Sequence, residues 1–495
     1  MTNMTNMTNM TKLIAFAMVS LTLVLIVSGR ANAQFTWAAD NAGNYGGNWS
    51  NGSDGGSGFG AWGFGVGSNT GNFIGNPANN GMGTSGIGTT AFGLYATGAN
   101  YFNGGRAFDS AMQVGDAFTF WWAMNWDANG GNKGIDLKAN NSTIFNVNNG
   151  GSALITTSNG TANSTYGTTP MLVTATRTSG SQYSFSMTSR SGGGTYSTTF
   201  NSSVGLDSFN LYIGNQNEGN GNRNIYFNNF QLANSGDYNF GGTVTESRSL
   251  SGGGALTVSG NTTLDLTSTA NTFTGGSTVN AGSTLRIGTG GANGSLSGSV
   301  VNNGALAFNS TSVTSFGGQL TGSGTTTKSA AGVLSLSGNS SAYAGSTLVE
   351  TGTLFLSGTI GGNVSISTAA VIRGTGRVGG NLVMATNSKL GFDGSSILNV
   401  GGTASFSGPF GVANVLGLDG STAEGTYTLI SGSVNFANVT NVGESNKASI
   451  GGTKSAYFVP GSMNIVVVPE PSALAVACAG LAGLAACSRR RRRAA

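Results

Sequence analysis

The chain has 495 residues, of which 85 are glycine and only 8% are charged. This shortage of Lys, Glu and Arg leaves little material for amphipathic helices, whereas strands joined by tight turns use Gly, Ser, Thr and Asn freely. The hydrophobic content of 38% is too high for a disordered chain, and a collagen-like Gly-X-Y period is absent. The composition therefore predicts an all-β protein with a hydrophobic core.

Charge and reactive residues exclude several classes of function. The formal charge is +4, but the run Arg489 to Arg493 holds five of the 21 basic residues, and Lys12 and Arg30 flank an N-terminal apolar segment. The rest of the chain is therefore slightly acidic, which excludes the basic surface that nucleic acids need. Histidine is absent and both cysteines lie near the C-terminus. A Ser-His-Asp triad, a Cys-His dyad and a His-ligated metal site are thus excluded.

Residues 1–33 have the pattern of a secretory signal peptide. Lys12 precedes an apolar run from Leu13 to Val27, and Ala31 and Ala33 form a small-x-small cleavage site for signal peptidase. A membrane anchor is the alternative, but the run is shorter than the roughly 20 residues that a spanning helix needs. We expect the mature chain to start at Gln34.

Residues 34–236 contain short apolar stretches spaced about ten residues apart, which predicts a β-sandwich. Phe118, Phe120, Trp122, Met124 and Trp126 alternate with other residues, so they form one apolar strand face. Further strands are expected at Gly134–Lys138, Thr143–Val147, Leu172–Arg177, Gln182–Met187, Thr195–Phe200, Phe209–Ile213 and Ile225–Leu232.

The order of apolar residues in several of these expected strands is similar to that of a known fold. The order of Tyr183-Ser-Phe185, Phe209 to Ile213 and Tyr226 to Leu232 resembles the closing strands of concanavalin-like jelly rolls. That resemblance implies a jelly-roll sandwich, and many such domains bind glycans.

Two weak ligand sites are expected in this part of the chain. Trp121 points away from the apolar face of its strand, so it is a candidate for stacking on a sugar ring, unless the second sheet face is covered. A Gly-rich turn carries four oxygen-bearing side chains, which are candidate Ca²⁺ ligands: Asp127, Asn129, Asn132 and Asp136. A plain hairpin loop is the alternative, because no bidentate Glu follows at loop spacing. No other metal or cofactor is expected.

Residues 237–462 repeat a unit of Gly, a spacer and alternating apolar residues. The equivalent positions are Leu264, Leu285, Leu306, Leu334, Leu354, Ile372 and Leu390. A period near 20 residues is typical of a solenoid, because each unit is too short to bury its own apolar face. We expect a right-handed parallel β-helix of about eleven turns, with these residues in one ladder.

A longer sequence pattern occurs twice within the repeat region. The pattern from Leu264 to Gly282 recurs about 70 residues later, from Leu334 to Gly352. It resembles the autotransporter-associated β-strand repeat, which implies a β-helical stalk outside a bacterial cell and implies no reaction.

The C-terminal segment 463–495 combines three features in order. The motif Pro469, Glu470 and Pro471 precedes a 16-residue apolar run at 472–487, expected to be a single hydrophobic transmembrane helix. A basic cluster follows: Arg489, Arg490, Arg491, Arg492 and Arg493. The positive-inside bias keeps this cluster cytoplasmic, so the rest of the chain lies outside the membrane.

These three features resemble the PEP-CTERM sorting tail of Gram-negative bacteria. The resemblance implies recognition and cleavage by an exosortase near the Pro-Glu-Pro motif. It also implies transient anchoring in the inner membrane, followed by delivery to the cell surface or extracellular matrix. An uncleaved single-span anchor is the alternative, with the same outward location.

The sequence therefore predicts a non-enzymatic, exported structural protein. A glycan-binding adhesin that uses the β-sandwich to hold extracellular polysaccharide is the first alternative. A polysaccharide lyase or glycosidase is the second, although the 17 acidic residues are scattered and no close pair in the sequence suggests a catalytic dyad.

Overall fold

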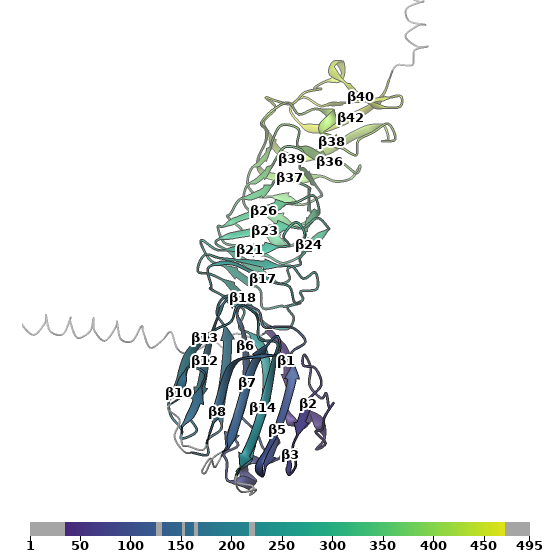
Figure 1. Ribbon diagram of the computed structural model, residues 1–495. Coiled ribbons are helices and arrows are strands. Elements are labelled where there is room, and N and C mark those ends of the chain that lie inside the picture. The colour runs from purple at the N-terminus through teal and green to yellow at the C-terminus, as the bar shows by residue number, and fades with distance from the viewer. Residues whose placement is uncertain (1–34, 125–130, 151–153, 163–166, 217–222, 471–495) are drawn as a thin grey trace, which may run out of the picture.

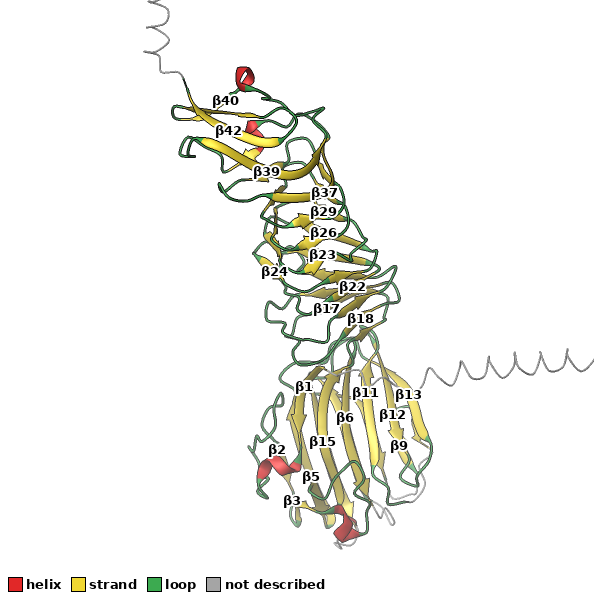
Figure 2. Ribbon diagram, turned by 180° about the vertical axis from the view of Figure 1, so that it is seen from behind, coloured by secondary structure: helices red, strands yellow, loops and turns green. Residues whose placement is uncertain are grey.

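The computed structural model describes residues 35–124, 131–150, 154–162, 167–216 and 223–470. An N-terminal body of two antiparallel sheets and a parallel solenoid lie end to end, so the molecule is elongated (Figure 1). Strands and loops make up almost all of the described chain (Figure 2). The helical segments in it are short 3-10 turns: η1 (Ala42–Tyr45), η2 (Pro77–Asn80), η4 (Val412–Asn414) and η5 (Glu444–Asn446).

The N-terminal body encloses one hydrophobic core between its two sheets. The eight-stranded sheet has the order β13 (Thr195–Asn201), β12 (Gln182–Thr188), β11 (Met171–Arg177), β6 (Asp116–Met124), β15 (Ile225–Asn234), β4 (Ala91–Ala96), β3 (Thr70–Gly75), with β1 (Phe35–Asp40) also paired to β15. The seven-stranded sheet has the order β10 (Gly160–Ala162), β9 (Ile155–Thr157), β8 (Ser142–Asn149), β7 (Asn132–Ala139), β14 (Ser208–Gln216), β5 (Gly98–Ala107), β2 (Gly63–Val66).

Side-chain alternation explains how these strands pack. Phe118, Phe120 and Trp122 of β6 are buried in the core, as the period-2 pattern predicts. All seven further strands expected from the sequence lie within β7, β8 and β11 to β15.

The solenoid begins at β16, where pairing changes from antiparallel to parallel. Its first face consists of β16 (Asp237–Tyr238), β18 (Leu256–Val258), β20 (Ser277–Val279), β22 (Val300–Asn302) and β25 (Leu320–Thr321). The second face consists of β17 (Gly242–Glu246), β19 (Thr262–Leu266), β21 (Thr284–Ile287), β23 (Ala305–Asn309), β26 (Thr325–Ser329), β29 (Thr347–Val349), β32 (Val364–Ile366), β35 (Leu382–Met384), β37 (Leu398–Phe406) and β39 (Gly425–Val434). The third consists of β24 (Thr314–Phe316), β27 (Val333–Leu336), β30 (Thr353–Leu356), β33 (Val371–Arg373), β36 (Lys389–Gly391) and β38 (Val415–Leu416). The short strands β28 (Asn339–Ser340), β31 (Thr359–Ile360) and β34 (Arg377–Val378) pair in series and join β37.

The expected single leucine ladder is wrong, because the structure contains two. Leu264, Leu285 and Leu306 stack on the second face. Leu334, Leu354, Ile372 and Leu390 stack on the third face. The spacing between Leu306 and Leu334 is longer than the others because the chain makes one turn and then passes a corner to the next face.

The solenoid has about eight turns rather than eleven. At about 4.8 Å per turn, this part of the rod is roughly 40 Å long. The last described residues leave the coil: β39 pairs antiparallel with β42 (Met463–Pro469), followed by β41 (Lys454–Phe458) and β40 (Ala448–Gly451). Residues 463–469, which we assigned to the tail from the sequence, thus belong to the folded body. Their alternating side chains Met463, Ile465 and Val467 are buried, which explains the difference.

Candidate functional site

The sorting motif begins directly on the final strand. Pro469 ends β42 and lies opposite Lys454 of β41. The backbone N–H of Glu470 donates to the Thr453 carbonyl oxygen at 2.6 Å, and Ser455 Oγ donates to Glu470 Oε1 at 2.8 Å. No linker therefore separates the first two residues of the motif from the folded body.

Several sequence-predicted sorting residues lie outside the described part of the chain. These are Ala31, Ala33, Pro471, the apolar run at 472–487 and Arg489 to Arg493. Among the described residues, no helix has the length and apolar character needed to cross a membrane.

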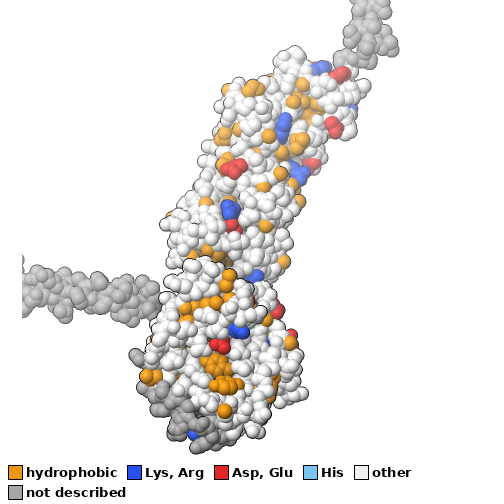
Figure 3. Space-filling view, in the orientation of Figure 1, with side chains coloured by type: hydrophobic (Ala, Val, Ile, Leu, Met, Phe, Trp, Pro, Cys, Tyr) orange, Lys and Arg blue, Asp and Glu red, His pale blue; other side chains and the backbone are white. Residues whose placement is uncertain are grey.

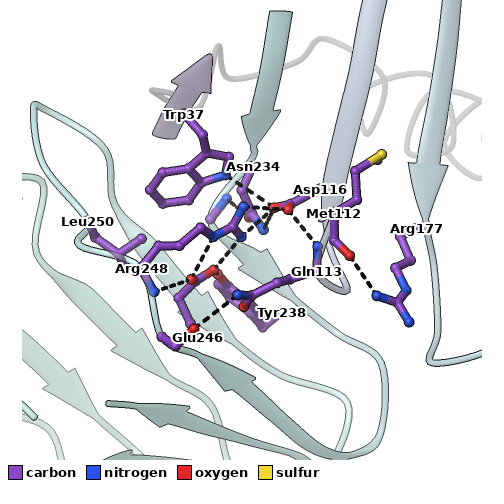
Figure 4. Close-up of polar contacts among 12 residues, drawn as sticks. Trp37, Met112, Gln113, Asp116, Arg177, Asn234, Tyr238, Glu246, Arg248 and Leu250 are labelled. Atoms are coloured by element: carbon purple, nitrogen blue, oxygen red, sulfur yellow. Dashed lines mark hydrogen bonds and ion pairs between the residues drawn. The ribbon is translucent and has the colours of Figure 1, made fainter. Parts of the chain in front are cut away.

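A charged network joins the two bodies at the other end of the solenoid (Figure 4). The guanidinium of Arg248, in the first solenoid turn, holds both carboxylate oxygens of Asp116 on β6, at 2.6 and 2.8 Å. It also donates to Glu246 at 2.8 and 3.0 Å. The Asp116 and Glu246 side chains are almost completely buried, and that of Arg248 is 15% exposed. Burial disfavours the charged guanidinium, but its hydrogen bonds to these carboxylates outweigh burial and raise the pKa of Arg248.

Residues from both bodies complete this junction. Trp37 of β1 stacks on the Arg248 guanidinium, 4.2 Å from the ring centroid, and its Nε1 donates to Asp116. Asn234 Nδ2 also donates to Asp116, and the Tyr238 hydroxyl donates to Glu246. The acceptors of both carboxylates are thus engaged, which suits a rigid joint rather than a site for chemistry.

A second arginine binds two carboxylates inside the N-terminal body. Arg106 forms ion pairs with Asp40 and Asp54 beside Tyr45. Burial raises the pKa of Asp40 above its ordinary value, in spite of the hydrogen bond that the Tyr45 hydroxyl donates at 2.7 Å. In both arginine-bound pairs of acids, at least one carboxylate is sealed from solvent. Neither pair has the open geometry in which two carboxylates flank a glycosidic bond.

The predicted sugar-stacking residue Trp121 lies on the outer face of the eight-stranded sheet, but a loop covers part of it. Trp121 packs with a small cluster that includes Met82 and Ile87. Gly86 lies against the indole, since a Cβ at this position would come within 2.2 Å of the ring. The indole of Trp121 is therefore partly covered, and it does not offer a fully exposed ring face for a sugar.

Only two of the four Ca²⁺ candidates lie in the described part of the chain. Asp127 and Asn129 lie outside it, while Asn132 and Asp136 occupy the same face of β7, four residues apart. Their oxygens accept hydrogen bonds from neighbouring amides. No group of three or more Asp or Glu side chains arranged to hold a metal occurs among the residues that the structure describes.

Sequence reasoning missed a row of amides and tyrosines on the outer face of the seven-stranded sheet. We call it the amide row: Tyr101, Asn132, Asn148, Tyr212, Asn146, Asp136 and Asn210. Consecutive members are joined by side-chain hydrogen bonds of 2.8–3.4 Å. Strand register brings them together from four strands, β5, β7, β8 and β14. Burial raises the pKa of the Tyr212 hydroxyl, which accepts from Asn146 and donates to Asn148.

Comparisons with known proteins identify the C-terminal end. Residues 467–492 match the family model of the PEP-CTERM protein-sorting motif. A search of curated proteins finds no match to this sequence. Among solved structures, two single-substitution mutants of HCR/D are similar, with 13% and 11% identity and TM-scores of 0.23 and 0.22. Each match covers 35% of this chain and 42% of the other, so the chain spans less than half of these structures.

The family match begins within β42 and includes the Pro-Glu-Pro motif whose first two residues are attached to β41. It continues through most of the arginine cluster. The chain therefore carries a PEP-CTERM sorting motif at its C-terminal end.

Proposed function

We propose that this protein is a non-enzymatic structural component of the bacterial surface or extracellular matrix. Signal peptidase removes the N-terminal segment, and an exosortase-type protease recognises the tail while the apolar run holds the chain in the inner membrane. The observation that carries the proposal is the sorting motif at the end of a β-solenoid.

The shape of the molecule supports a structural role. The N-terminal body and the sorting motif lie at opposite ends of the elongated molecule (Figure 1). The buried Arg248 network ties this body to the first solenoid turn. A protein held at its C-terminal end would thus present the N-terminal body at a distance from the membrane.

The test is surface exposure in the native host. We expect a variant with all five arginines from Arg489 to Arg493 replaced by Ala to stay in the cell fraction, inaccessible to added protease. Arg373→Ala with Arg377→Ala is the matched control, because both arginines are exposed on the solenoid. Equal surface exposure of the five-alanine variant and the wild type would contradict the proposal.

A second candidate function is glycan binding by the N-terminal body, for which a concanavalin-like jelly roll is the fold we propose. The amide row supports this candidate, because amides, a carboxylate and tyrosines are the side chains that hold sugar hydroxyls and ring faces. Lyase or glycosidase chemistry has no comparable support from the described carboxylates.

A further inference from the structure

We propose that the outer face of the seven-stranded sheet binds a neutral polysaccharide chain that lies along β14. The inference deepens the glycan-binding candidate above and is independent of the sorting proposal. Two hollows adjoin on this face. One, of about 350 Å³, is lined by Asn103 and by every member of the amide row except Asn210. The other, of about 550 Å³, is lined by Gly105, Lys138, Asp207 and Ser208, among others.

The two hollows form one groove because three strands, β5, β7 and β14, each line both of them from neighbouring outward-facing positions. On β5, Asn103 lines the smaller hollow and Gly105 the larger one. Asp136 and Lys138 do the same on β7, and Tyr212 and Asn210 on β14. From Asn132 to Lys138 the groove extends six residues, or about 20 Å at strand rise. This length fits an extended chain of sugar rings better than a single sugar.

Glycines keep the floor of the groove low. Gly214 lies under the ring of Tyr101, since a Cβ at Gly214 would come within 1.9 Å of that ring. Gly134 is similarly close to Tyr212, whose hydroxyl oxygen would lie 2.6 Å from a Cβ there. A larger side chain at either position would push the ring off the sheet. One face of the Tyr101 ring rests on Gly214. Because Tyr101 is 44% exposed, part of its ring is free to stack on the apolar face of a sugar.

The amide row supplies donors and acceptors in fixed positions. An amide has two donor hydrogens and two acceptor lone pairs, and the hydrogen bonds within the row use only part of this capacity. Asn148, for example, donates once to Asn132 and accepts once from Tyr212. Groups held in place in this way lose little side-chain entropy when a ligand binds.

The charges favour a neutral ligand. Within the groove, the ammonium of Lys138 is accompanied by the carboxylates of Asp136 and Asp207. The guanidinium of Arg106 is directed to the inner side, where Asp40 and Asp54 neutralise it. Few charged side chains appear on this face of the N-terminal body (Figure 3). An acidic polysaccharide would find no excess of positive charge here.

The tyrosine end of the groove is also the end farther from the solenoid. Phe108 donates to the carbonyl of Asp207, and Met112 to that of Leu206, which places the Asp207 end near the junction residue Gln113. Tyr101 and Asn132 lie at the opposite ends of their strands. This is the position in which a bound polymer would be held away from the C-terminal tail.

The test is isothermal titration calorimetry of the exported protein with neutral hexasaccharides: cellohexaose, maltohexaose, xylohexaose and mannohexaose. We expect at least one to bind, and Tyr101→Ala to weaken it at least fivefold. Asn103→Ala should weaken it as well, because the exposed Asn103 lines the groove. Tyr95→Ala is the matched control, because Tyr95 is 40% exposed on the other sheet, and it should change the affinity less than twofold.

Two outcomes would overturn the proposal. One is that none of the four hexasaccharides binds at millimolar concentration. The other is that a hexasaccharide binds Tyr101→Ala, with unchanged melting temperature, as tightly as the wild type. Tighter binding of oligogalacturonate than of every neutral hexasaccharide would contradict the neutral ligand. None of these results affects the sorting proposal, which depends on surface exposure.

Discussion

The junction between the two bodies gives the sharpest energetic prediction. Arg248→Met removes the cation that neutralises two buried carboxylates, one in each body, while it keeps most of the side-chain volume. Removing one partner of a buried ion pair costs about 3–5 kcal/mol, because the remaining charge is left without compensation. Since Asp116 and Glu246 both lose their partner, we expect the upper half of this range.

The assay is thermal unfolding of the mature protein followed by circular dichroism and calorimetry. A loss of about 4–5 kcal/mol lowers the melting temperature by about 8–20 °C for bodies of this size. Lys447→Met is the control: Lys447 pairs with Glu444 at 4.0 Å, and the Glu444 side chain is 69% exposed. Such an exposed pair contributes at most about 1 kcal/mol.

A compensating variant separates charge from packing. Arg248→Met combined with Asp116→Asn and Glu246→Gln removes all three charges, so it should recover much of the lost stability. The reasoning is refuted if Arg248→Met melts within 1 °C of the wild type, or if the triple variant is no more stable than the single one.

Three further predictions concern the solenoid and its end. Leu354→Ala should cost about 2–5 kcal/mol by leaving a cavity between Leu334 and Ile372, whereas Leu348→Ala, on the outer surface, should cost less than about 0.5 kcal/mol in denaturant unfolding. Burial lowers the pKa of Lys328 from its usual 10.5 to about 8, so the unfolded chain binds more protons between these values and stability should rise with pH from 8 to 10. Lys328→Met should abolish that rise in urea midpoints measured across this range, and an equal rise in both proteins would assign it to another group. A chain that ends at Val468 loses only the pairing of Pro469 and Glu470 with β41, so its melting temperature should stay within a few degrees of that of the full body; a molten terminal sheet would contradict this.

Local patterns predicted much of the fold. The alternation around Phe118 to Met124 and the period near 20 residues depend on side chains close in sequence, so strands and solenoid were visible without a structure. The sequence did not predict which leucines lie on which face of the solenoid, because the strand-and-turn pattern of the repeat is the same for every face. The repeated pattern that aligns Leu264 with Leu334 thus aligns β19 of the second face with β27 of the third face.

The amide row was beyond prediction for a different reason. Tyr101, Asn146 and Tyr212 are separated by 45 and 66 residues, and only the register of antiparallel pairs brings them to one face. A shift of one residue in β14 would turn Tyr212 into the core. The sequence placed Asn132 in a Gly-rich turn, whereas Asn132 is the first residue of β7.

The central claim is that the protein is exported and processed at both ends, and the intact mass of the exported form tests it most directly. We predict a species that begins at Gln34 and lacks the arginine cluster, with its C-terminus near Val468. Recovery from the cell surface or medium of only those species that retain Arg489 to Arg493 would contradict exosortase-type processing.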